Sequence, residues 1–82
     1  MKNIEEKFEK YKLETEKVLI DCEANTNRAI AVIAQTRRDF DFAFFHELKA
    51  AAKFAKNGNF EIANISLCLA FENLNKTKDF VN

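Results

Sequence analysis

The sequence predicts an all-α protein, either a three-helix bundle or a long helix followed by a helical hairpin, and it predicts assembly into an oligomer. The 82 residues contain no proline and one glycine, and residues 1–57 contain neither. These two residue types interrupt regular structure most strongly. The remaining residues there are mostly good helix formers such as Glu, Lys, Ala, Leu and Arg. The length is that of one domain, which we place over residues 1–82.

The clearest helix break is Asn57-Gly58-Asn59. Glycine readily adopts the left-handed conformation that closes a helix at its C-terminus. Lys53 and Lys56 precede the glycine, and cations in a last turn interact favourably with the helix dipole. We therefore expect one helix to end near residue 56 and another to begin at residue 60.

The position of an earlier break is open to three readings. Asn25-Thr26-Asn27 clusters residues that prefer helix caps to helix interiors. Thr36-x-x-Asp39 is a rival, because it resembles a capping box with Asp in place of Glu. An unbroken helix would be too long for a monomer to cover and would imply an oligomer. We favour the first reading, with helices over about 2–24, 27–56 and 60–78.

The first predicted helix has one regular apolar stripe and a second, thinner one. The regular stripe repeats every four and three residues, which is typical of a helix packed along a neighbour. It consists of Ile4, Phe8, Tyr11, Thr15, Val18 and Cys22. Leu13, Ile20 and Ala24 form the thinner stripe on the other side. Charges at i,i+4, such as Glu6 and Lys10, are expected to pair along the flanks.

The third predicted helix is apolar on two opposite faces, which is the main evidence for self-association. One face carries large and small apolar residues from Phe60 to Leu74, and the other carries Ile62, Ile65 and Leu69. A helix that is apolar on both sides must be buried on both sides, and a chain this short has too few helices to cover it. We expect a homodimer or a higher oligomer. The candidate contacts are Leu13, Ile20, Ile62, Ile65 and Leu69.

The segment Arg37-Arg38-Asp39-Phe40-Asp41-Phe42 alternates charge with aromatic residues. Its structural interpretation is an ion pair between Arg37 and Asp41, or a helix cap at Asp39. Its functional interpretation is a protein-binding surface, because arginine and aromatic residues dominate interface energetics. The candidate protein-binding residues are Arg37, Arg38, Asp41, Phe42 and Phe45. An alternative basic patch for nucleic acid would consist of Arg28, Arg37 and Arg38, but the neighbouring aspartates cancel much of its charge.

Catalytic, metal and cofactor chemistry is not expected. His46-Glu47 lacks the second histidine of a zinc-protease helix, because position 50 is alanine. Cys22 and Cys68 lie in apolar surroundings and are predicted to be inert core thiols. One glycine cannot form a phosphate-binding loop. Thirteen basic and thirteen acidic residues give zero net charge, which argues against a protein that mainly binds nucleic acid.

The hairpin predicted over Phe45 to Leu74 resembles a single helical hairpin of the tetratricopeptide repeat family. The residues that carry the resemblance are Ala51, Phe54, Gly58, Phe60 and Ala63. The signature tryptophan and the terminal proline of that repeat are missing, and no second copy follows. Stacked repeats need neighbours for stability, so the resemblance reflects the physics of hairpins and not membership of the family.

The functional prediction is a small non-enzymatic interaction module that associates with itself and binds another, unidentified protein. Alternatives are a nucleic-acid-associated regulator and a purely structural self-assembling subunit. The abundance of Lys, Asn and Phe suggests an AT-rich gene of the kind found in phages and mobile elements, which would suit an inhibitor or adaptor. The charged segment Met1–Lys12 and the two cysteines favour a reducing, cytoplasmic location without a membrane span.

Overall fold

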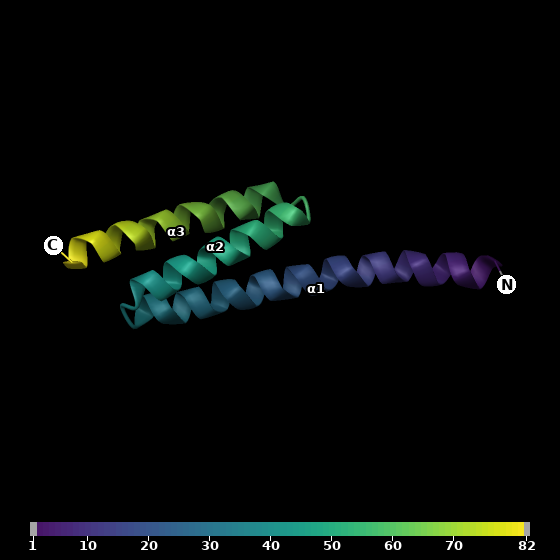
Figure 1. Ribbon diagram of the computed structural model, residues 1–82, viewed down its shortest axis with the longest axis horizontal. Coiled ribbons are helices and arrows are strands. Elements are labelled where there is room, and N and C mark those ends of the chain that lie inside the picture. Colours follow the sequence, from purple (N-terminus) through teal and green to yellow (C-terminus); the bar gives the residue numbers. More distant parts are fainter. Residues whose placement is uncertain (1, 82) are drawn as a thin grey trace.

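The protein is a long helix followed by a helical hairpin, so the predicted all-helical fold class is confirmed, and the second of the two predicted arrangements is the one observed. The computed structural model describes the backbone of residues 2–81 and the side chains of residues 3–77. Helix α1 spans Lys2–Thr36, α2 spans Phe40–Lys56 and α3 spans Phe60–Val81. Helix α2 lies between the other two and packs on both (Figure 1). The result is a thin, elongated molecule of 65 × 20 × 13 Å.

The predicted break at residues 25–27 is wrong, because α1 continues through it. The cap-preferring side chains bend back onto carbonyl groups one turn earlier. Thr26 Oγ1 donates a hydrogen bond to the Cys22 carbonyl at 2.9 Å, and Asn27 Nδ2 donates to the Glu23 carbonyl at 2.9 Å. Side chains satisfied in this way can remain inside a helix. The break instead lies at the rival position, between Thr36 and Phe40.

The two turns between helices close in the same way. In the first, the Asp39 N–H bonds to the Ala34 carbonyl and the Arg38 N–H to the Gln35 carbonyl. In the second, the equivalent donors are Asn59 and Gly58. This pair of bonds is the Schellman motif, which requires a left-handed residue after the helix. Gly58 supplies it with φ 80°, as predicted, and Arg38 supplies it with φ 62°.

The N-terminal half of α1 projects beyond the hairpin (Figure 1). The turn between α2 and α3 reaches α1 at Lys17, whose carbonyl accepts a hydrogen bond from Asn57 Nδ2 at 2.7 Å. The carboxylate of Asp21 accepts from the same amide and from Asn59 Nδ2. These bonds fix the turn against α1 at this level. Residues 3–16 of α1, which we call the arm, lie N-terminal to it, and each of their side chains is exposed.

The interior of the molecule is made of alanine. Among the described residues, nine hydrophobic residues are buried, and Phe54 is the one that is not alanine. Ala24, Ala31 and Ala34 of α1 face α2, whereas Ala63 and Ala70 lie on α3. Small side chains let helix axes approach closely. The large aliphatic and aromatic side chains are therefore left on the outside of the molecule.

The two apolar stripes of α1 have exchanged the roles expected of them: the stripe expected to pack within the chain is exposed, and the thinner stripe packs. The thin stripe is the one that packs on α2, since Ala24 is buried and Ile20 is half-buried. The members of the regular stripe, Ile4, Phe8, Tyr11, Thr15, Val18 and Cys22, are all exposed. We call the four that lie within the arm, from Ile4 to Thr15, the arm seam. Heptad spacing identified the stripe, but no helix of the same chain covers it.

Candidate interaction surfaces

The predicted protein-binding residues lie around the start of α2 and are all exposed. Phe42 and Phe45 flank the ring of His46, with centroid distances of 4.5 and 5.4 Å. Lys49 Nζ lies 5.1 Å from the centre of the Phe45 ring, within the range of a cation–π contact. The structure thus brings Phe42 and Phe45 together on one surface with two nitrogen-bearing side chains, which suits contact with both apolar and acidic groups.

A groove of about 270 Å³ begins beside Phe42 and runs between α1 and α2. Its lining consists of Ile30, Ile33, Ala34, Arg37, Asp39 and Phe42. Arg37 and Phe42 therefore share a surface, as the alternation of charge and aromatic residues suggested. An apolar floor with one arginine and one carboxylate at the rim has the composition of a protein-binding surface.

The predicted ion pair between Arg37 and Asp41, around the turn between α1 and α2, does not form. Arg37 lies in the turn after α1 and not on a helix continuous with Asp41, and no ion pair joins them among the described residues. Asp39 occupies the position before α2, but its side chain makes no cap hydrogen bond. Asp41 Oδ1 instead accepts from the Phe42 N–H at 2.9 Å. A side-chain hydrogen bond with Asp41 raises the pKa of Asp39.

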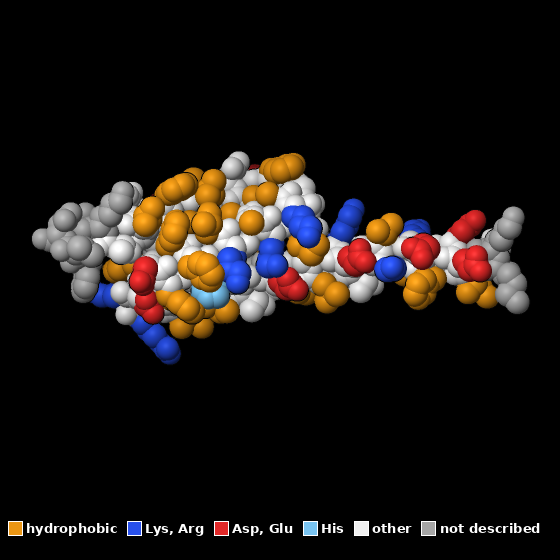
Figure 2. Space-filling view, in the orientation of Figure 1, with side chains coloured by type: hydrophobic (Ala, Val, Ile, Leu, Met, Phe, Trp, Pro, Cys, Tyr) orange, Lys and Arg blue, Asp and Glu red, His pale blue; other side chains and the backbone are white. Residues whose placement is uncertain are grey.

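A second apolar surface covers α3 and the adjoining side of α2 (Figure 2). Ile62 and Ile65 are 41% and 49% exposed, and Leu69 is half-buried. A groove between α2 and α3 adds further apolar lining; its residues are Leu48, Ala51, Ala52, Ala55, Phe60, Ala63, Asn64 and Leu67. Both faces of α3 identified from the sequence therefore retain exposed large side chains in a single copy. Contiguous apolar exposure of this kind marks interaction sites.

The predicted self-association residues on α1 differ in their surroundings. Leu13 lies on the arm and is exposed, whereas Ile20 is half-buried on the side of α1 that packs on α2. Ile20 is thus partly used within the chain. The arm seam, which the sequence assigned to packing within the chain, is the exposed apolar surface of α1.

Several buried polar side chains were not predicted. Arg28 Nε lies 3.5 Å from Glu47 Oε1, and the Glu47 side chain is 1% exposed. Ser66 and Asn73, two turns apart on α3, are also buried. Burial raises the pKa of Glu47, and the nearby Arg28 partly opposes the rise. The ion pair with Glu47 offsets the charge of Arg28, one of the three arginines of the alternative basic patch.

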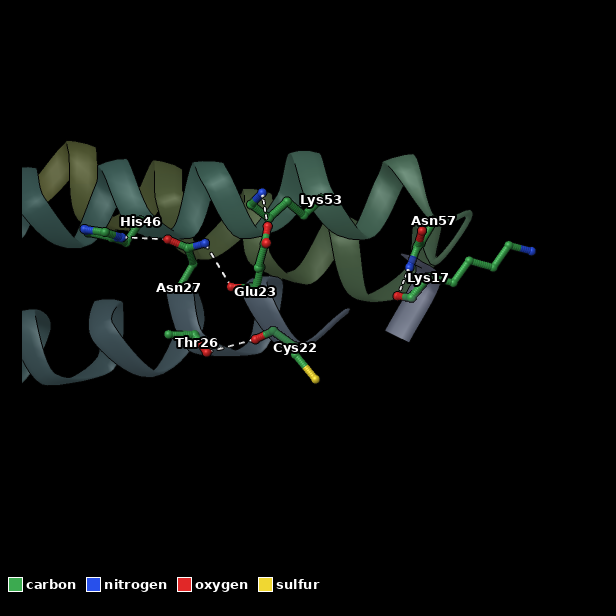
Figure 3. A network of polar contacts seen from close by, with 8 residues as sticks. All are labelled: Lys17, Cys22, Glu23, Thr26, Asn27, His46, Lys53 and Asn57. Atoms are coloured by element: carbon green, nitrogen blue, oxygen red, sulfur yellow. Dashed lines mark hydrogen bonds and ion pairs between the residues drawn. The ribbon is translucent and has the colours of Figure 1, made fainter. Parts of the chain in front are cut away.

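Polar contacts also join α1 to α2 along their shared edge (Figure 3). His46 Nδ1 lies 2.8 Å from Asn27 Oδ1; because that oxygen only accepts, the ring nitrogen is the donor. Lys53 Nζ donates to Glu23 Oε2 at 2.7 Å, and this hydrogen bond lowers the pKa of Glu23. The residues of these pairs are separated by 19 and 30 positions in the sequence, so no local sequence motif predicts the contacts.

Cys22 and Cys68 are exposed and unbridged, so the prediction of core thiols is wrong. Within the described part of the chain, no three His, Cys, Asp or Glu side chains gather as a metal site. None of the helices there carries an apolar stretch long enough to cross a bilayer. No protein family model, no curated protein and no solved structure matches this chain.

Proposed function

We propose that this protein is a small non-enzymatic interaction module that associates with itself and binds another protein. The observation that carries the proposal is the inverted distribution of side-chain size, with alanine inside and large apolar residues outside. Fifteen large hydrophobic side chains are exposed among the described residues. Full burial of such a side chain is worth about 1.5–3 kcal/mol relative to full exposure, and these side chains are 39–69% exposed, so each forfeits part of that free energy. Association would recover part of that free energy.

Three surfaces support two kinds of contact. The arm seam and the α3 surface with Ile62 and Ile65 are mainly apolar, which suits a contact between copies of the chain. The surface around Phe42 and Phe45 adds Arg37 and Lys49 to its aromatic rings. Aromatic residues combined with arginine are typical of binding hot spots, so this surface is the better candidate for a different protein, as in an adaptor or inhibitor.

Sedimentation equilibrium of the full chain across the micromolar range tests self-association. We expect a mass above the 9.5 kDa of one copy. The double substitution Ile62→Asp and Ile65→Asp tests whether α3 contributes, and Glu72→Gln on the same helix is the matched exposed control. A protein that stays monomeric throughout the range would contradict the proposal.

Binding to a second protein is tested by capture from an extract of the native host. Phe42→Ser with Phe45→Ser should abolish specific capture while leaving the helical content of the chain unchanged. Phe60→Ser provides a control, because Phe60 is even more exposed but lies on the α3 side of the molecule. Equal capture by all three proteins would show that the surface around Phe42 does not bind the partner.

A further inference from the structure

The arm carries an uncovered coiled-coil seam. Ile4, Phe8 and Tyr11 are 69%, 66% and 60% exposed. Together with Thr15 they alternate at spacings of four and three, the repeat with which two helices interlock side chains along their length. Helices α2 and α3 do not cover this side of α1. The seam therefore lacks the second helix that its spacing requires.

The charged residues beside the seam are also without partners in the described part of the chain. Glu5 and Lys12 follow the seam on one side, and Lys7 and Glu14 on the other. The ion pairs that the structure shows there join Arg28 to Glu47 and Lys53 to Glu23, so the predicted i,i+4 pairs of the arm are not formed. The four flanking charges are thus available to a second helix, and such charges set the orientation of coiled coils.

A parallel arrangement of two arms places like charges together. In a parallel pair, the flanking residue that directly precedes Phe8 or Thr15 faces the residue five positions later on the second helix. Lys7 would then face Lys12 of a second copy, and Glu14 would face Leu19. The first contact is repulsive and the second is neutral, so charge disfavours the parallel pair.

An antiparallel arrangement with Phe8 opposite Tyr11 of a second copy pairs each flanking charge with its opposite. Residues on the same flank then face one another. Glu5 faces Lys12 of the second copy and Lys7 faces Glu14, and the twofold axis repeats both contacts. Sliding the helices by seven residues in one direction places Lys12 opposite Lys12 and Glu14 opposite Glu14 of the second copy. Sliding them in the other direction places Glu5 opposite Glu5 and Lys7 opposite Lys7. Among these registers, only the one with Phe8 opposite Tyr11 pairs all four flanking charges with opposite charges.

The same register fits the length of the arm. Ile4 lies opposite Thr15 of the second copy, so the paired segment ends just before Lys17, where the turn between α2 and α3 contacts α1. We propose that the arms of two copies form an antiparallel coiled coil in this register, with the two hairpins at opposite ends of the dimer. The proposal deepens the self-association proposed above and rests on it.

Charge reversal tests the orientation, because parallel and antiparallel pairs respond with opposite sign. Lys7→Glu places two acidic residues together in the antiparallel dimer and should weaken it about tenfold. Adding Glu14→Lys should restore the wild-type dissociation constant measured by sedimentation. In a parallel dimer, Lys7→Glu would face Lys12 and tighten association, which would overturn the proposal. Circular dichroism of each variant confirms that the helices remain intact.

Cysteine cross-linking tests the register in a background with Cys22→Ser and Cys68→Ser. We expect a mixture of the Ile4→Cys and Thr15→Cys proteins to form a mixed disulfide dimer, with little of either homodimer. Disulfides between two copies of Ile4→Cys would overturn the antiparallel pair. A dimer whose dissociation constant is unchanged by Lys7→Glu, but which dissociates in the Ile62→Asp, Ile65→Asp variant, would also overturn the arm proposal. Self-association itself would remain in place. A monomeric wild type would defeat both.

Discussion

Arg28 Nε lies 3.5 Å from Glu47 Oε1, and Glu47 is almost entirely shielded from water. The surrounding helix faces are built from alanine, which offers no hydrogen bond to a carboxylate. The cost of desolvation therefore dominates, and the pKa of Glu47 rises above its ordinary value. A charged pair at this depth is weak evidence for stability but fixes which residues of α1 and α2 face each other.

The stability of the protein should fall as pH rises above about 4.5, the ordinary pKa of Glu47. A raised folded-state pKa means that the folded chain binds the proton more tightly, so this contribution is lost as pH rises through the folded pKa. Glu47→Gln should remove the fall. Thermal unfolding from pH 4 to 8 measures the stability of both proteins. If stability falls with pH as steeply in Glu47→Gln as in the wild type, Glu47 is not the cause of the fall.

Glu23 should produce the opposite dependence at lower pH. The hydrogen bond from Lys53 lowers its pKa, so its stabilising contribution is present above about 4.5 and is lost as pH falls through the folded pKa. Lys53→Gln should reduce the loss of stability between pH 4.5 and 3. The matched control is Lys49→Gln, since Lys49 lies one turn away on α2 and makes no such ion pair in the described structure.

Arg38→Gly should stabilise the protein by about 1 kcal/mol. Arg38 holds φ at 62°, a conformation that costs a residue with a β-carbon about 1–2 kcal/mol. Gly58→Ala should destabilise it by about 1 kcal/mol for the same reason, because a β-carbon there meets no atom within 4 Å and only the backbone is strained. Chemical denaturation measures both changes. Equal stability of Arg38→Gly and wild type would contradict the strained turn.

Enlarging a buried alanine should harm stability more than truncating a surface aromatic. Ala50 is fully buried between α1 and α2, and Ala50→Leu should cost about 1–3 kcal/mol or more by forcing the helices apart. Phe45→Ala should cost less than about 1 kcal/mol, because half of that ring is already exposed. Urea unfolding of the two variants gives the comparison. The reverse order would mean that the large residues form the core.

The candidate surfaces were predictable where they depend on neighbouring residues. Arg37 and Phe42 share a groove, as the alternation of charge and aromatic residues indicated, and Ile62 and Ile65 are exposed, as helical spacing indicated. The contact between Asn27 and His46 was not predictable, because it joins residues on different helices. Asn27 also misled the prediction of the break: its side chain prefers a cap, but packing of α1 on α2 keeps the helix continuous and the amide bonded to Glu23.

The sequence by itself determined the all-helical class and the turn at Gly58, because helix propensity and left-handed glycine act over a few residues; it did not determine where the first helix ends. It also determined that this chain has more apolar helix surface than one copy covers. Tertiary structure alone decided which stripe of α1 packs on α2. Where α2 lies along α1, the stripe with Ala24 packs on it because alanine permits a close approach of the helices, and Val18 and Cys22 of the other stripe stay exposed.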